Sequence, residues 1–258
     1  MFMRYIFFKS NVISFYTIVR KELSRVLRIW PQTILPPIVT SVLYFFIFGN
    51  LVGKRIGYMS GYSYIQYIIP GLIMMSVVTS SYSNVVSSFF GSKFQKNIEE
   101  ILISPTYNSV IVFGFISGGI LRSFIVCIFI YIISSFFCNF YLYSFFVIFI
   151  IYFLTAILFS LFGLINGIFA KKFDDVSIIP TFILTPLIYL GGIFYSVDLL
   201  PSELKIFVLF NPIFYIVNVF RFGILGISEI NIYFSFFIMF FFIIFFYFLA
   251  LYFLKKRL

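Results

Sequence analysis

The acidic side chains are the first candidates for chemistry, because paired carboxylates can act as general acid and base or can ligate a metal ion. The chain has 258 residues, of which only 8 are acidic and none is histidine. Two acidic pairs occur, Glu99-Glu100 and Asp174-Asp175. The second pair directly follows two lysines, so local charge compensation accounts for it. We therefore expect no catalytic residues and no metal site in this chain.

The sequence also lacks the motifs for nucleotide and redox chemistry. No G-x-x-x-x-G-K-[ST] loop is present to hold the phosphates of ATP. The two cysteines, Cys127 and Cys138, share one apolar stretch without C-x-x-C spacing, so we expect free thiols and not a metal site or a disulfide. We expect no cofactor, and any ATP hydrolysis linked to this chain would have to come from a separate polypeptide.

One arginine lies well inside an apolar stretch. A charge at the centre of a membrane costs at least about 2.5–3.5 kcal/mol on insertion scales, so Arg122 should be compensated. Its side chain could extend to the inner membrane surface, pair with Glu99 or Glu100, or contact an anionic group of a substrate. The residue alone does not decide among these three.

A stripe of small polar residues marks a second apolar stretch. Such stripes serve close helix packing or line a substrate path, and both readings stay open. The residues recur at helical spacing, and together with Arg122 they are our candidates for a transport pathway: Ser76, Ser80, Ser83 and Ser87.

The overall composition shows what surrounds these residues. Hydrophobic residues make up 62% of the chain and charged residues 10%, and the mean hydropathy is +1.13. An ordinary soluble domain has about 45–50% apolar and about 25% charged residues. The apolar runs follow one another without a long hydrophilic insert, so the sequence predicts one all-α membrane domain over residues 1–258.

Six apolar stretches are long enough to cross a bilayer. A spanning helix needs about 20 apolar residues, because each adds about 1.5 Å against a hydrocarbon core of roughly 30 Å. Prolines at 36, 37, 70, 180 and 186 should bend three of these helices. The predicted spans are Thr33–Val52, Tyr64–Phe90, Ser109–Phe137, Tyr143–Phe169, Ser177–Phe194 and Ile232–Leu254.

The basic residues predict the orientation. Most of the 18 lysines and arginines fall on one side if both termini are cytoplasmic, which satisfies the positive-inside rule. They cluster at the ends of segments, so the net charge of +10 does not indicate binding to nucleic acid.

The chain before the first span is predicted to form an interfacial helix. Within residues 1–30, the part from Ile13 to Trp30 alternates apolar residues with basic ones. Such a helix suits the cytoplasmic headgroup layer. It could be a plain anchor, or it could take part in moving the first span.

The segment 92–107, on the inner side, is predicted to contain a short amphipathic helix that ends at Pro105. Lys96, Glu99 and Glu100 should pair on one turn, while Ile98, Ile101 and Leu102 form an apolar strip. It could be a solvated connecting helix, but its adjacent carboxylates also suit the docking of a soluble partner.

The segment 191–222, on the outer side, is predicted to hold two short helices. Gly191 and Gly192 can end the fifth span, Pro201 suits a first helical position, and Asn211 and Pro212 read as an N-cap and a helix start. Both helices are too apolar for open water. We expect them to dip back into the outer leaflet under a cover of protein.

These inner and outer segments resemble those of ABC-2 type transporter permease subunits, and the resemblance covers nearly the whole chain. It implies a fold of six transmembrane helices, a cytoplasmic ABC ATPase partner, a permease homodimer surrounded by membrane lipid, and a place in the bacterial inner membrane. By resemblance, the coupling region for the ATPase consists of Gln95, Glu99, Glu100 and Pro105, and the outer re-entrant motif of Gly191, Gly192, Pro201, Asn211 and Pro212.

The function that this resemblance implies is that of the membrane subunit of an ATP-driven exporter of a lipid, a polysaccharide or a hydrophobic compound. A secondary transporter or channel is the alternative, although no acidic or histidine residue for ion coupling was found within a span. An intramembrane enzyme acting on lipid is a further alternative, which the scarcity of acid, base and metal-ligand residues disfavours.

Overall fold

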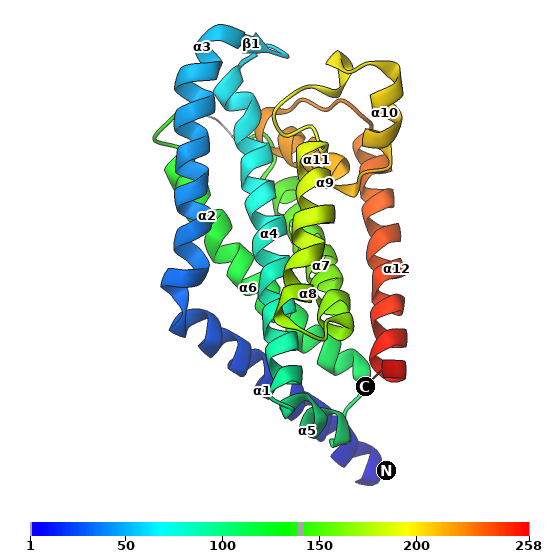
Figure 1. The fold of residues 1–258 in the computed structure, drawn as a ribbon. Helices are drawn as coiled ribbons and strands as arrows, with labels where there is room; N and C mark the ends of the chain where they lie inside the picture. Colours follow the sequence, from blue (N-terminus) through cyan, green and yellow to red (C-terminus); the bar gives the residue numbers. More distant parts are fainter. Residues whose placement is uncertain (1, 139–141, 258) are drawn as a thin grey trace.

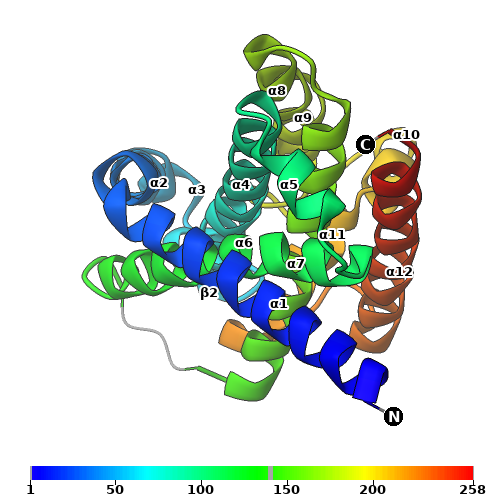
Figure 2. The same ribbon diagram turned by 90° about the horizontal axis from the view of Figure 1, so that it is seen from below.

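The computed structural model describes residues 2–138 and 142–257. Long helices lie side by side in one bundle, and helix α1 (Phe2–Arg28) crosses its lower end (Figure 1). Figure 2 shows α1 from below, where it passes under several helices of the bundle. The all-α membrane fold is therefore confirmed, and the interfacial helix begins well before the Ile13 that its amphipathic pattern suggested.

In the described parts of the chain, five helical runs are long and apolar enough to span a membrane. The first joins α2 (Trp30–Tyr44), the π-helical η1 (Phe45–Val52) and α3 (Gly53–Ile56). The other four are α4 (Tyr64–Phe94), α6 (Asn108–Ser134), α7 (Phe145–Phe169) and α12 (Ile232–Arg257). Each agrees with a predicted span within a few residues.

The predicted fifth span is shorter and less regular. It consists of α8 (Phe173–Ile179), the π-helical η2 (Pro180–Leu184) and α9 (Thr185–Tyr189), which follow one another without a break. At about 1.5 Å per residue this run is roughly 26 Å long, slightly less than the hydrocarbon core. Pro180 begins the π-helical turns and Pro186 lies just after them in α9, and neither can donate to the regular helical ladder.

A small hairpin joins the first two spans and was not predicted. Strands β1 (Tyr58–Met59) and β2 (Tyr62–Ser63) pair antiparallel, Tyr58 with Ser63 and Met59 with Tyr62. Ser60 and Gly61 between them have φ of 51° and 86°. Two positive φ values in a two-residue loop give the twist that a tight hairpin needs.

Helix α4 is the centre of the bundle. It packs against α6, α7 and α11 (Pro212–Leu225). In its most apolar stretch 83% of the residues are buried, against 18% for the first span and 17% for α12. The first span and α12 therefore have the most apolar surface left for lipid or for another copy of the chain.

The predicted outer segment forms a sharply bent pair of helices after the short η3 (Val197–Leu199). Helix α10 (Ser202–Leu209) and α11 meet at 87°. Both lie at the upper end of the bundle in Figure 1, the same end at which α3 and β1 lie. The pair is therefore bent at one end of the bundle, and its depth in the outer leaflet stays a prediction.

Both termini lie at the opposite end from this bent pair. Figure 1 places the N-terminus, the C-terminus and α5 (Asn97–Ile103) together at the lower end. An even number of crossings follows from this arrangement. We call the end with the termini and α5 the inner end and the other the outer end.

Candidate functional site

The first candidate surface is α5 at the inner end. Ile98 is buried against the bundle, whereas Glu99 and Glu100 are exposed. The helix ends at Ile103, two residues before Pro105, and Gln95 at the end of α4 accepts a hydrogen bond from the side chain of Asn97 at 3.1 Å. The predicted coupling residues therefore lie together on and beside one short helix.

The predicted pairing of Lys96 with these carboxylates is wrong for the described part of the chain, where neither glutamate is within ion-pair distance of a base. Lys96 has φ of 62° and ψ of 4°, so it is left-handed and precedes the helix instead of belonging to its first turn. The two carboxylates stay exposed to a partner.

Helix α1 is fixed to the bundle by a buried ion pair. The carboxylate of Glu22 is fully buried, lies 3.2 Å from the guanidinium of Arg25, and accepts a hydrogen bond from Ser88. Arg25 in turn donates to the backbone and side-chain oxygens of Asn84 on α4 at 2.9 and 2.8 Å. Helix α1 is thus bound to α4 through polar contacts, and its place in the headgroup layer stays a prediction.

Lys21 adds a second polar contact between the same helices. Its ammonium group donates to Ser92 on α4 at 2.8 Å. Burial lowers the pKa of Lys21 below its ordinary value, an effect that the neighbouring Glu22 carboxylate opposes. A cavity of about 530 Å³ separates this part of α1 from α5, and Thr17, Lys21 and Glu100 are among the residues that line it.

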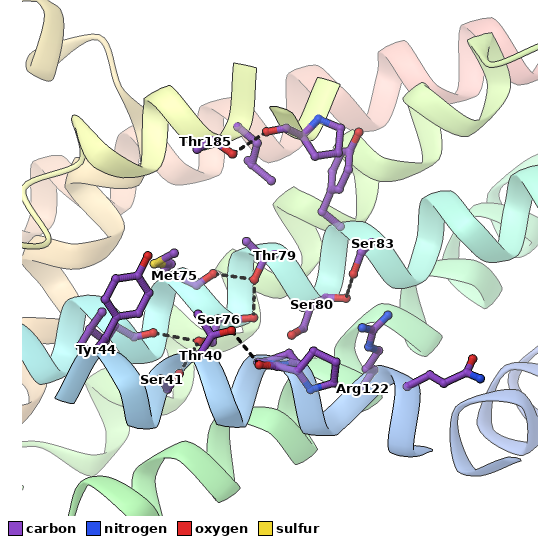
Figure 3. Close-up of a pocket in the computed structure, with 17 residues that line it drawn as sticks. Thr40, Ser41, Tyr44, Met75, Ser76, Thr79, Ser80, Ser83, Arg122 and Thr185 are labelled. Atoms are coloured by element: carbon purple, nitrogen blue, oxygen red, sulfur yellow. Dashed lines mark hydrogen bonds between the residues drawn. The ribbon is translucent and has the colours of Figure 1, made fainter. Parts of the chain in front are cut away.

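The second candidate site is a cavity of about 360 Å³ within the bundle. Its walls come from α2, from α4 and from the irregular fifth span around η2, and Arg122 of α6 reaches it (Figure 3). The cavity contains three of the four predicted pathway serines: Ser76, Ser80 and Ser83. Ser87 lies outside it and accepts a hydrogen bond from Arg25 at 3.4 Å.

Arg122 contacts the start of α2. Its Nη2 donates to the carbonyl oxygen of Thr33 at 3.0 Å. In a regular helix that carbonyl would accept from the N–H of residue 37, which is Pro37 and has none. Arg122 therefore satisfies a carbonyl that proline leaves open. It forms no ion pair with Glu99 or Glu100 within the described ranges.

Aromatic side chains lie at the outer end of this cavity. The hydroxyl groups of Tyr44 and Tyr189 are 3.3 Å apart and join α2 to α9. One turn further out, the rings of Phe48 and Phe194 are 4.8 Å apart, and each tyrosine ring also lies near Phe194. We call Tyr44, Phe48, Tyr189 and Phe194 the aromatic cluster.

The third candidate region is the predicted outer motif. Asn211 caps α11 by accepting from the N–H of Ile213 at 3.0 Å and donates to Leu187 of α9 at 2.6 Å, and Pro212 begins the helix. Gly191 has room for no side chain, since a Cβ there would lie 2.7 Å from Ile213. Gly192 has φ of 68°, and Pro201 directly precedes α10.

An ion pair holds this outer region together. Arg221 of α11 donates to the carbonyl of Gly192 at 2.7 Å and lies 3.4 Å from Glu229, with its guanidinium 3.9 Å from the ring centre of Tyr67. Glu229 also accepts from the hydroxyl of Tyr67 at 2.5 Å and from the N–H of Val197 at 3.0 Å. We call these contacts the outer latch.

Comparison with known proteins decides the family. The family model described as ABC-2 type transporter matches residues 13–225. The chain belongs to the ABC-2 type transporter family. As a permease of that family it is a transport subunit and not an enzyme.

The relatives of this ABC-2 permease agree with this. It is 52% identical over 219 residues to the inner membrane transport permease YadH of Escherichia coli strain K12, covering 85% of this chain and 86% of the relative. It is 23% identical over 195 residues to nodulation protein J of Rhizobium leguminosarum bv. viciae, covering 75% of each.

Sequence reasoning about this permease missed two acidic residues that the structure makes central. Glu22 was counted with the polar face of α1, although it lies four residues after Ile18 and four before Val26, which are both buried. That spacing could have placed it on the buried face. Glu229 lies between α11 and α12 with no periodic pattern around it, so only its closeness in sequence to Arg221 was a signal.

Among the residues that the structure describes, no three histidine, cysteine or acidic side chains gather where they could hold an ion. Cys127 and Cys138 are free thiols.

Proposed function

We propose that this ABC-2 permease is the membrane subunit of an exporter that a separate cytoplasmic ATPase drives through α5. The observation that carries the proposal is the position of Glu99 and Glu100, exposed at the inner end on a helix two residues beyond the end of α4. A partner that moves α5 moves the central helix of the bundle.

The charge of this surface fits a partner with basic side chains. Carboxylates that are exposed and unpaired within the fold keep their full attraction for a cation across an interface, which mainly favours correct and fast association. The cavity between α1 and α5 adds apolar and hydroxyl-bearing surface beside them. The coupling region of Gln95, Glu99, Glu100 and Pro105 therefore presents both charge and shape.

The first span supports a homodimer as the working unit. It carries a row of large apolar side chains that one chain leaves exposed, among them Leu35, Val39 and Leu43. Lipid can cover such a row, and so can the same row on a second copy related by two-fold symmetry. The cavity lies on another side of the same helix, where other residues of α2 line it.

The proposed location is a bacterial inner membrane with both termini and α5 in the cytoplasm. The excess of basic residues at the inner end supports this orientation. The name of the Escherichia coli relative supports the membrane. The cargo class that we propose is a lipid, a polysaccharide or a hydrophobic compound, in keeping with a cavity that has both hydroxyl and apolar walls.

Transport would proceed by alternating access. The aromatic cluster lies at the outer end of the cavity, and we infer that this cluster would have to rearrange before cargo could leave outward. Closure of the ATPase subunits would tilt α4 through α5 and separate Tyr44 from Tyr189.

Affinity purification of the tagged permease from its native membrane tests the partnership. We expect a stoichiometric ATPase subunit in the mass spectrum and ATP hydrolysis in the eluate. The double substitution Glu99→Lys and Glu100→Lys should lose both without loss of folded permease. Glu203→Lys is the matched control, since it reverses an exposed acid of α10 at the outer end. A stable permease that never carries an ATPase would contradict the proposal.

A further inference from the structure

Two buried polar groups in the cavity lack partners. The side chain of Ser80 belongs to a residue that is 1% exposed, and Arg122 is 9% exposed. Within the described chain, neither Ser80 Oγ nor Arg122 Nε has a hydrogen-bond partner. Both residues line the cavity, and Figure 3 shows them between α4 and α2. Buried polar groups are normally satisfied, so these two need an explanation.

The contact of Arg122 with the start of α2 does not explain why a charged side chain is buried here. Its bond to Thr33 satisfies a carbonyl that Pro37 leaves open. That bond uses one of the five N–H donors of a guanidinium group. A neutral donor would satisfy the same carbonyl without the cost of burying a charge. The positive charge of Arg122 therefore has a use beyond the start of α2.

Among the described residues, no acidic side chain lies within ion-pair distance of Arg122. The two ion pairs found among residues 2–138 and 142–257 join Arg25 to Glu22 and Arg221 to Glu229. Glu22 is the acidic residue on the neighbouring α1, and its carboxylate already forms an ion pair with Arg25 and accepts a hydrogen bond from Ser88. A cation in a medium of low dielectric constant attracts an anion far more strongly than it does in water. The cavity thus favours an anionic occupant beside Arg122.

The rest of the lining is mixed. Ser76, Thr79 and Ser83 provide hydroxyl groups along α4, and their recorded bonds go to Ser41 or to backbone carbonyls. Apolar side chains provide part of the remaining surface, among them Pro36, Pro37, Leu72, Met75 and Leu184. An occupant that fits both walls has a polar head and an apolar part.

We propose that this cavity binds an anionic amphiphile, with a phosphate or carboxylate group at Arg122 and a hydrogen bond from Ser80. The apolar part of the ligand lies along the proline and leucine side chains of α2, α4 and η2. The inference rests on the proposed function only in treating the cavity as part of the transport path. It narrows the cargo to molecules that carry an acidic head group.

Binding to the purified permease without any ATPase tests this directly. Native mass spectrometry of the delipidated protein would measure the dissociation constants for phosphatidic acid and for phosphatidylcholine with the same acyl chains. We expect phosphatidic acid to bind at least about tenfold more tightly, as a charge-assisted hydrogen bond allows. Glycerol 3-phosphate, which has the head group without the chains, should compete poorly.

Two matched pairs of variants locate the site. Arg122→Gln should remove most of the preference for phosphatidic acid, whereas Arg28→Gln, which removes an exposed charge of α1, should change it less than about twofold. Ser80→Ala should weaken binding about threefold. Ser81→Ala should not, because Ser81 lies next to it but bonds to Val77 and does not line the cavity.

Several results would overturn the inference. Equal binding of the two lipids, an equal effect of Arg28→Gln and Arg122→Gln, or competition by glycerol 3-phosphate as strong as that of phosphatidic acid would each do so. If Arg122→Gln lowers the yield of folded protein, the affinities of Ser80→Ala and Ser81→Ala for phosphatidic acid test the inference instead. Neither of these substitutions changes a charge. The binding assay contains no ATPase, so a negative result in it would not contradict the proposed ATPase partnership. In the same way, the absence of an ATPase partner would not contradict a positive binding result.

Discussion

The carboxylate of Glu22 lies 3.2 Å from the guanidinium of Arg25 and has no exposure to solvent. This pair is the point where the interfacial helix α1 is joined to α4, because Arg25 also binds Asn84 and Glu22 also binds Ser88. The N-terminal helix is therefore part of the folded bundle.

Glu22→Ala should destabilise the permease by about 3 kcal/mol, because it leaves a largely buried arginine without its counter-ion. Thermal unfolding in mild detergent would measure the effect as a lower Tm. The double substitution Glu22→Gln and Arg25→Gln should cost less than Glu22→Ala, since no unpaired charge remains. Glu203→Ala, at an exposed acid, is the control, and an equal loss of stability there would contradict the role of the pair.

Glu229→Ala should loosen the outer latch. It removes the acceptor for Tyr67, Arg221 and the N–H of Val197 together. Hydrogen exchange should then quicken in residues 191–200, while α7 keeps its protection. Asp198→Ala changes an exposed acid in the same loop and should leave exchange unchanged. Unaltered exchange in Glu229→Ala would show that other contacts hold the loop.

Gly163→Ala should destabilise the packing of α7 on α4 by about 1–3 kcal/mol. A Cβ at this position would lie 2.5 Å from the backbone oxygen of Tyr82, and backbone cannot move aside as a side chain does. Gly91→Ala is the matched control in α4, because a Cβ there meets nothing within 4 Å. It should be neutral or stabilising, as alanine favours helix over glycine. The Tm values of the two variants check both expectations.

Tyr44→Ala should open the outer end of the cavity. It removes the bond to Tyr189 and one ring of the aromatic cluster. A Ser76→Cys reporter in a Cys127→Ala, Cys138→Ala background, treated from outside with a membrane-impermeant thiol reagent, should label faster by about tenfold, because Ser76 lines the cavity and is buried. Tyr44→Phe keeps the ring and should raise labelling much less. Equal labelling of all three proteins would mean that the cluster does not close the cavity.

The sequence predicted the long helices well and their contacts poorly. Apolar length alone places α4, α6, α7 and α12, because lipid leaves a spanning segment no other way to satisfy its backbone. The fifth span was predicted to bend at Pro180 and Pro186, but its π-helical turns were not predicted, since the effect of these prolines on helix geometry depends on their neighbours. Asn211 and Pro212 were assigned correctly as cap and start, because both signals are local.

Contacts between distant segments follow a different rule. The partners of Arg122 were left open because Thr33 is 89 residues away along the chain. The pairing of Lys96 was wrong because a single left-handed residue removed it from the helical turn. Charge patterns within one helix assume that the helix is regular, and tertiary structure decides whether it is.

Helix α4 continues through Pro70 as one helix of 31 residues, about 46 Å long, with Tyr67 of the outer latch near one end and α5 joined to the other. Near its inner end, Lys93 donates to the carbonyls of Ile168 and Ala170 at 2.6 and 2.9 Å, which ties it to the end of α7. If α4 pivots about these Lys93 contacts, most of its length lies on the outer side of the pivot. A small tilt imposed on α5 would then appear magnified at Tyr67, on the far side of the membrane.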